Sequence, residues 1–153
     1  MSWFRKAGVE SVVYLDTGCL VKLYYPEPDS DLVAARTSGE PIAYTPLHGL
    51  ELTTAFKLKV FRKEATMDQA TNALGLVGED ISAGKLVLIN APALDSLIAA
   101  TQLAAKHAAE TGYRALDTLH CAWAMNLGVA GFVSTDARQL ALARIIGLLI
   151  LKL

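Results

Sequence analysis

Four acidic residues of the chain have the surroundings that a catalytic metal site would need: Asp16, Glu51, Asp117 and Asp136. Asp16 and Asp136 each follow a short apolar run, and Asp117 and Glu51 lie in apolar segments with helical spacing. A carboxylate in apolar surroundings is unfavourable unless a partner compensates it. Several carboxylates brought together either take up protons or hold a cation.

Each acid also has a local explanation when it is considered singly. Asp117 and Asp136 could cap helices, which stabilises a helix by about 1 kcal/mol per cap. Glu51 could pair with a lysine of its own helix. The residue types alone leave both possibilities open.

The tripeptide Asp16-Thr17-Gly18 also occurs in the catalytic loops of aspartic proteases. That fold is all-β and carries two such loops, whereas residues 18–25 have helical spacing and the tripeptide occurs once. A protease is therefore disfavoured.

Short apolar runs alternate with amphipathic segments along the chain, which favours a parallel sheet covered on both faces. In such folds, ligands bind beyond the carboxyl ends of the strands, at the point where strand order reverses. Length predicts one domain, residues 1–153. The expected strands are 12–15, 42–45, 85–89, 132–134 and 148–151, and the expected helices are 18–25, 29–38, 46–63, 66–83, 95–110, 116–127 and 137–146.

The donor type predicts which ion and which reaction fit the acids. All-oxygen ligands favour Mg²⁺ or Mn²⁺. Such an ion activates water and orients a phosphate, which suits phosphodiester cleavage. The chain has no glycine-rich phosphate loop and no Ser-His-Asp order, so triphosphate and acyl chemistry lack support.

Bulk properties limit the remaining classes. The composition is 53% hydrophobic, which predicts a substantial core, and the net charge of −1 means that any contact with a polyanion must come from local patches. The apolar run after the N-terminal basic residues is too short for a signal peptide, and no stretch approaches the ~20 residues of a membrane span. Two cysteines without metal-like spacing favour a reducing, cytoplasmic location.

Four segments, in order, resemble the acidic motifs of PIN-domain proteins: LDTGCLVKLYYPEP, PLHGLELTTAF, RALDTLHCAWA and FVSTDARQLALARIIGL. The chain is most similar to the VapC type, the ribonuclease toxins of type II toxin–antitoxin pairs. The resemblance covers nearly the whole chain from about Val12, and the order of four weak motifs carries it.

The resemblance implies a three-layer α/β/α fold with a central parallel sheet. It implies that Asp16, Glu51, Asp117 and Asp136 bind Mg²⁺ or Mn²⁺ and that metal-activated water cleaves RNA. It also implies a homodimer, inhibited by a cognate antitoxin whose tail covers the acidic pocket.

One departure is Gly18, where the family often has serine. Thr17 remains as a supporting hydroxyl, and Thr135 could supply another or cap a helix. Lys22 and Arg114 are the better candidates for RNA contacts, since they lie near the acidic motifs.

His48 and His120 each lie three residues from a motif acid. His48 could lie at the pocket rim, and a hydrogen-bonded structural role is favoured for His120. A catalytically weak PIN-like binding module is the alternative to an enzyme.

Overall fold

A computed structural model describes residues 11–90 and 92–153 of the chain. Residues 1–10 and Ala91, which the single-domain prediction includes, lie outside the described residues. The elements are β1 (Val13–Leu15), α1 (Thr17–Tyr24), α2 (Ser30–Thr37), β2 (Ile42–Tyr44), α3 (Pro46–Phe61), α4 (Met67–Ser82), β3 (Leu86–Leu88), α5 (Ala93–Thr111), α6 (Ala115–Leu127), β4 (Gly131–Val133) and α7 (Ala137–Ile145).

Local sequence explains where the helices begin and end. Thr45 and Thr66 cap α3 and α4, and each cap is reciprocated by the side chain three residues later. Pro46 occupies the first position of α3, where its missing N–H costs nothing. Helices α5 and α6 end at Gly112 and Gly128 in the left-handed conformation that glycine adopts readily.

The four strands form one parallel sheet in the order β3-β2-β1-β4. Val13 pairs with Ile42 of β2 and with Gly131 of β4, so β1 is central. All three residues of β1 are buried. This matches the expectation that parallel strands are apolar because both faces are covered.

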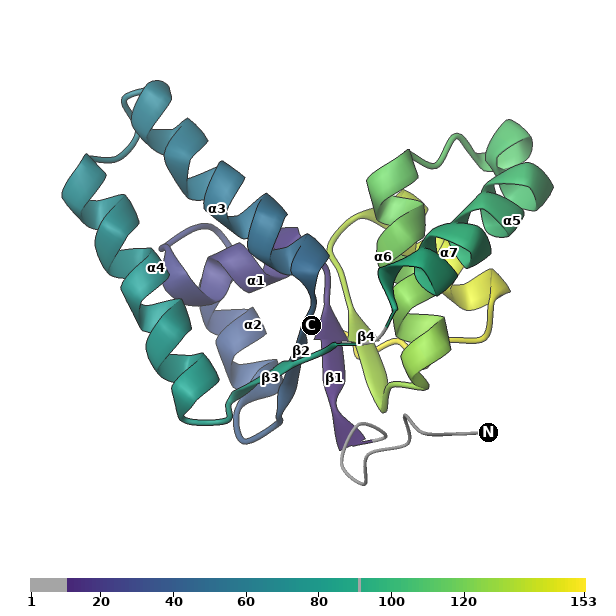
Figure 1. The fold of residues 1–153 in the computed structure, drawn as a ribbon, viewed down its shortest axis with the longest axis horizontal. Coiled ribbons are helices and arrows are strands. Elements are labelled where there is room, and N and C mark those ends of the chain that lie inside the picture. The colour runs from purple at the N-terminus through teal and green to yellow at the C-terminus, as the bar shows by residue number, and fades with distance from the viewer. Residues whose placement is uncertain (1–10, 91) are drawn as a thin grey trace.

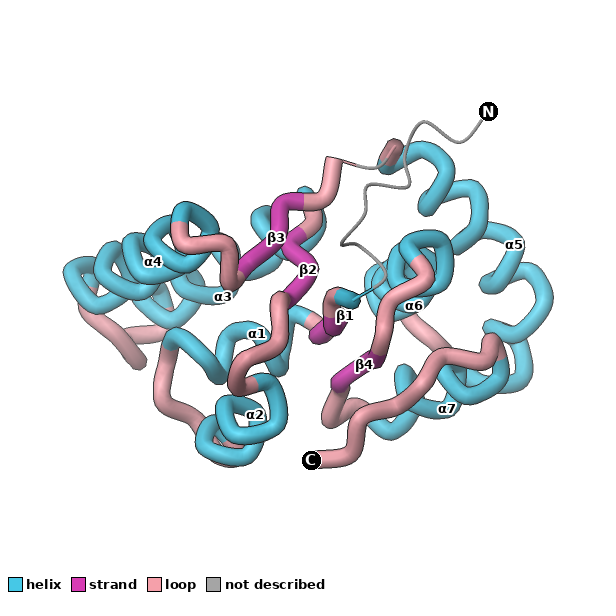
Figure 2. The backbone as a smooth tube through the Cα atoms, turned by 90° about the horizontal axis from the view of Figure 1, so that it is seen from below, coloured by secondary structure: helices cyan, strands magenta, loops and turns pink. Residues whose placement is uncertain are grey.

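Helices cover both faces of the sheet (Figure 1). Seen from below, α1–α4 lie on one side of the strands and α5–α7 on the other (Figure 2). Alternate β1 residues point to opposite faces: Val13 and Leu15 join one apolar core with α1–α4, and Tyr14 joins a second with α5–α7. The predicted three-layer α/β/α architecture with a central parallel sheet is therefore confirmed.

The direction of chain progression reverses next to β1. From β1 the chain adds β2 and then β3 on one side, and it returns to place β4 on the other side of β1. The crevice at the carboxyl ends of β1 and β4 is therefore the topological switch point, where α/β folds bind ligands.

Two expectations about local structure were wrong. Residues 148–151 form no strand of their own: Ile150 makes only a single parallel bridge with Phe132. Helix α5 was expected to start at Asp95 but begins at Ala93, with Pro92 as an N-cap that makes no side-chain hydrogen bond and Asp95 in the first turn. Neither change affects the switch point.

No helix within residues 11–90 and 92–153 is long and apolar enough to cross a membrane.

Candidate functional site

Asp16 stands at the carboxyl end of β1 and caps α1. Its Oδ1 accepts a hydrogen bond from the Cys19 backbone N–H at 2.7 Å, and its Oδ2 accepts one from the Ser134 hydroxyl at 2.6 Å. The side chain is mostly buried, with 8% of the residue exposed. Each oxygen can still bind a further donor or a cation, because a carboxylate oxygen accepts more than one hydrogen bond.

Asp136 follows β4 and caps α7, so its Oδ1 accepts from the N–H groups of Arg138 and Gln139. Its own backbone N–H donates to Ser134 Oγ at 3.0 Å. Ser134 thereby joins the two acids on either side of the switch point. The local cap that the sequence suggested for Asp136 is confirmed, and it engages only one of the two carboxylate oxygens.

Glu51 lies in α3 and turns toward β1 instead of pairing with a lysine of its own helix, so that local explanation was wrong. Its Oε1 accepts from the Thr17 hydroxyl at 2.9 Å and lies 2.5 Å from His120 Nε2. Nε2 must carry a proton, since a carboxylate only accepts. His120 Nδ1 lies 2.7 Å from the buried Tyr14 hydroxyl, which completes a chain Tyr14–His120–Glu51.

This chain of hydrogen bonds sets the ionisation of its members. Partial burial raises the pKa of Glu51, but the hydrogen bond and charge of His120 and the hydroxyl of Thr17 outweigh it, and the net pKa is lowered. Burial raises the pKa of Tyr14 well above its ordinary value. Glu51 is therefore an anion at neutral pH, and Tyr14 remains a donor.

Asp117 lies in the first turn of α6, as expected, but it does not cap that helix, whose N-cap is Arg114. Asp117 Oδ2 instead accepts from Arg114 Nε at 2.9 Å. The same guanidinium reaches Asp136, with Nη2 at 3.9 Å from Oδ2. Its hydrogen bond with Asp117, then the charges of Asp117, Asp136 and Glu51, raise the pKa of Arg114.

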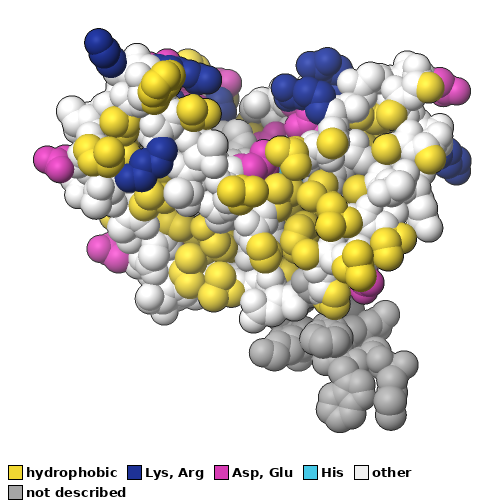
Figure 3. All heavy atoms as spheres, turned by 45° about the horizontal axis from the view of Figure 1, so that its top comes forward, with side chains coloured by type: hydrophobic (Ala, Val, Ile, Leu, Met, Phe, Trp, Pro, Cys, Tyr) yellow, Lys and Arg dark blue, Asp and Glu magenta, His cyan; other side chains and the backbone are white. Residues whose placement is uncertain are grey.

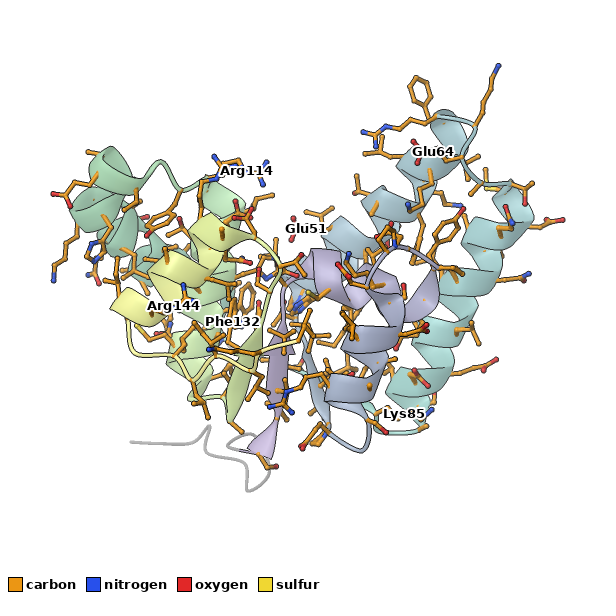
Figure 4. All side chains as sticks on the ribbon, turned by 180° about the vertical axis from the view of Figure 1, so that it is seen from behind. Glu51, Glu64, Lys85, Arg114, Phe132 and Arg144 are labelled. Carbon is orange, nitrogen blue, oxygen red and sulfur yellow. The ribbon has the colours of Figure 1, made fainter. Side chains whose placement is uncertain are left out.

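The four acids share one hollow at the carboxyl edge of the sheet. Figure 3 shows acidic side chains on the floor of a depression between two groups of helices, with lysine and arginine side chains on both rims. Figure 4 shows Glu51 pointing into the space between these groups, with Arg114 across from it at the start of α6. Electrostatically, the floor attracts cations and the rims attract anions.

The donor set fits a hard divalent cation, since it consists of carboxylate oxygens at a switch point. Asp16, Asp117, Asp136 and Glu51 are the residues that would hold it. Within residues 11–90 and 92–153, however, no three His, Cys, Asp or Glu side chains are gathered closely enough to form a ready-made metal site. Arg114 extends between two of the acids, and Asp16 and Glu51 are held by hydrogen bonds to other groups.

Three other sequence candidates lie away from the acids or have different roles. Lys22 donates to the carbonyl of Pro28, so it closes the loop after α1. Thr135 is exposed and does not cap α7, because Asp136 does. His48 is fully buried, so the rim position was wrong.

His48 supports the end of β1 from within. Its Nδ1 accepts from the Thr45 N–H at 3.0 Å, so Nε2 carries the proton and donates to the Leu15 carbonyl at 2.7 Å. Burial, with a smaller contribution from His120, lowers the pKa of His48 to about 3. A neutral His48 therefore holds the strand residue that precedes Asp16.

Sequence reasoning missed Ser134 and Gln139. Ser134 Oγ lies 2.6 Å from Asp16 Oδ2 and 2.7 Å from Gln139 Oε1, and Gln139 Nε2 donates to the Asp117 carbonyl at 3.3 Å. In the sequence they are two of several polar residues around Asp136, and only the structure shows that both are buried. They connect three of the four acids.

A groove of about 280 Å³ has Gly18, the neighbour of Asp16, in its lining, but none of the four acids. It runs between α1 and α3, with an apolar floor that includes Val21, Ala55 and Leu58. Gly18 lines one part of it, and Glu27, Lys59 and Arg62 add charges. Lys59 is paired with Glu27 at 2.7 Å, whereas Arg62 has no ion-pair partner among residues 11–90 and 92–153.

No protein-family profile matches this chain, and no curated protein matches it either.

Proposed function

We propose that this protein is a Mg²⁺- or Mn²⁺-dependent endoribonuclease of the PIN-domain type. The observation that supports this most is the position of Asp16, Glu51, Asp117 and Asp136 around one switch-point hollow, three of them linked through Ser134 and Gln139. An acidic floor between basic rims suits a cation below and a phosphate backbone above (Figure 3).

A bound divalent ion would supply a water of lowered pKa and would offset negative charge on the leaving oxygen of a phosphodiester. The chain's own residues orient the acids that hold it. Ser134 and the Cys19 N–H fix the two oxygens of Asp16, and Thr17 and His120 fix Glu51. Because these supports are mostly buried, they limit carboxylate rotation.

Exposed cations near the hollow would receive the RNA. Arg114 is exposed and lies three residues before Asp117. Arginine suits phosphate because its planar guanidinium donates two parallel hydrogen bonds. Lys22, which donates to Pro28, is a weaker candidate for this role.

The test is cleavage of RNA by the purified protein with Mn²⁺. We expect cleavage to stop with EDTA and to fall at least about 100-fold in Asp16→Asn, on the scale of losing a group that stabilises the transition state. Asp68→Asn, an exposed acid in the first turn of α4, is the matched control and should cleave like wild type. Activity that survives either chelation or Asp16→Asn contradicts the proposal.

We further propose that the protein is the toxin of a type II pair, cytoplasmic, and inhibited by an antitoxin peptide. The groove between α1 and α3 supports this, since an apolar segment lying in it would reach Gly18, which lies beside Asp16. A homodimer is supported by Leu94, Leu97 and Ile98, exposed at one-turn spacing in α5. A short DNA-binding antitoxin gene directly upstream, whose product suppresses cleavage, would support the pairing; its absence would count against it.

One observation favours a second candidate, a catalytically weak binding module. Every one of the four acids is engaged by the protein's own groups, and two of them by Arg114. Such a module would bind RNA without Mn²⁺ and would not cleave it. A filter-binding assay with and without EDTA, run beside the cleavage assay, separates the two candidates.

A further inference from the structure

Arg114 occupies an unusual place, between two of the four acids. Its Nε lies 2.9 Å from Asp117 Oδ2 and its Nη2 lies 3.9 Å from Asp136 Oδ2. The two carboxylates come from different elements of the α5–α7 side, α6 and the N-cap of α7, so one side chain connects these two elements. Figure 4 shows Arg114 at the beginning of α6, beside this space.

The other two acids are compensated by different means. Asp16 accepts from a backbone N–H and from Ser134, and Glu51 accepts from Thr17 and His120. Within the described part of the chain, the Oδ2 atoms of Asp117 and Asp136 have Arg114 as their partner. Asp136 uses its Oδ1 to cap α7, so its Oδ2 is the oxygen that the cap leaves for another partner.

We propose that Arg114 is an internal counter-ion that competes with the divalent cation for Asp117 and Asp136. When the cation binds, the guanidinium leaves these carboxylates and contacts the RNA phosphate. The inference rests on the proposed function, since it assumes that the acids hold Mg²⁺ or Mn²⁺.

The structure permits this movement. The Arg114 side chain is 68% exposed, and it makes no capping hydrogen bond to the helix that its backbone begins. Exposed ion pairs are weak because water and salt screen them. A divalent cation on the same oxygens has the greater charge, and it would repel a guanidinium only a few ångströms away. Displacement is therefore favourable, and the long side chain can swing without moving the backbone.

A displaced guanidinium would remain at the rim of the hollow. There it could donate two hydrogen bonds to a phosphate bound above the cation. Arg114 would thus oppose cation binding in the free protein and favour RNA once the cation is bound. These opposite effects distinguish it from a residue that only attracts RNA.

Calorimetric titration with MnCl₂ tests the inference without any measurement of activity. Wild type, Arg114→Gln and Arg138→Gln are compared. Arg138 is the matched control: it is exposed, lies two residues after Asp136, and its side chain forms no ion pair within residues 11–90 and 92–153. We expect Arg114→Gln to bind Mn²⁺ about threefold to fivefold more tightly, the upper part of the range of an exposed ion pair, and Arg138→Gln to stay within about twofold of wild type.

A second measurement uses RNA binding in saturating Mn²⁺, on an Asp16→Asn background if wild type cleaves too fast. Arg114→Gln should bind RNA about tenfold more weakly, the loss of one charge-assisted contact. Stronger Mn²⁺ binding together with weaker RNA binding supports the counter-ion.

The titrations distinguish failure of the proposed function from failure of the Arg114 counter-ion. If no variant binds Mn²⁺, the proposed function and the inference both fall. If wild type and Arg114→Gln bind Mn²⁺ equally, only the inference is overturned. If both arginine variants tighten Mn²⁺ binding alike, net charge is the cause, and the specific role of Arg114 is again overturned.

Discussion

The two sides of the acidic hollow are supported in different ways. On the β1 side, Asp16 and Glu51 are held by buried groups, among them Ser134, Thr17 and His120. On the α6 side, Asp117 is held by Arg114, whose side chain is 68% exposed. The β1 side of the site is therefore fixed by the core, whereas the α6 side can adjust to a bound cation or phosphate.

The largest expected effect is loss of the buried support. His120→Ala removes a hydrogen-bond partner of the buried Tyr14 hydroxyl and one of the two partners of Glu51 Oε1, and it opens a cavity. We expect the free energy of unfolding to fall by about 3 kcal/mol, measured by urea denaturation. On the exposed side, Arg114→Gln should leave stability unchanged.

His107→Ala on α5 serves as the control for removing a histidine and should change stability by less than about 0.5 kcal/mol. Equal losses in His120→Ala and Arg114→Gln would contradict the division between a fixed and an adjustable half.

Ser134→Ala should give the next largest effect. It removes the hydroxyl that serves Asp16 Oδ2 and the Asp136 N–H, all in buried or half-buried positions. We expect the unfolding free energy, measured by urea denaturation, to fall by about 2 kcal/mol. We also expect weaker Mn²⁺ binding in a calorimetric titration. The exposed neighbour provides the control, since Thr135→Ala should be close to neutral; a loss as large as that of Ser134→Ala would mean that the segment as a whole, and not the hydroxyl, is sensitive.

Lowering the pH should reduce the unfolding free energy through the buried His48. Its pKa is lowered to about 3 in the folded protein, against about 6.5 in an unfolded chain. Between these values only the unfolded state binds the proton, so unfolding free energy falls by about 1.4 kcal/mol for each unit of pH decrease. Urea titrations between pH 7.5 and 4.5 measure this slope.

His48→Gln should be less stable than wild type at pH 7.5 but should show a shallower slope from pH 6.5 downward. If the two slopes coincide, the acid sensitivity comes from other groups.

The smallest expected effect concerns Gly18, the departure from the family pattern. A Cβ at this position would lie 3.6 Å from Asp16 Oδ1, an ordinary contact, and the backbone is helical. Gly18→Ser should therefore raise unfolding free energy by about 0.5 kcal/mol, through helix propensity. Gly39→Ser is the contrasting control, because its φ of 77° strains any side chain and should lower stability. A loss of stability in Gly18→Ser would mean that glycine is required beside Asp16.

Much of the fold was predictable because local signals agree with the tertiary structure. Apolar runs, Pro46 and the glycines after α5 and α6 mark strands and helix ends without reference to distant residues. Residues 148–151 were the exception: their apolar run packs beside β4 with one bridge, and apolar character alone does not distinguish a strand from a packed tail.

The four acids could be identified from the sequence, but their partners could not. His120, Glu51 and Tyr14 come from three elements separated by up to 106 positions, and only the folded sheet brings them together. The sequence singled out Thr135 as a supporting hydroxyl, whereas Ser134 is the buried one that contacts Asp16. Buried polar networks depend on packing, which a single sequence does not display.

The most direct test of the account is whether the four carboxylates act together as one divalent-cation site. Calorimetric titration with MnCl₂ should be run on wild type, Asp16→Asn and the control Asp95→Asn, an exposed acid in α5. The account predicts that wild type and Asp95→Asn bind Mn²⁺ alike and that Asp16→Asn binds it at least about tenfold more weakly. Mn²⁺ binding that is absent from wild type, or unchanged in Asp16→Asn, would contradict it.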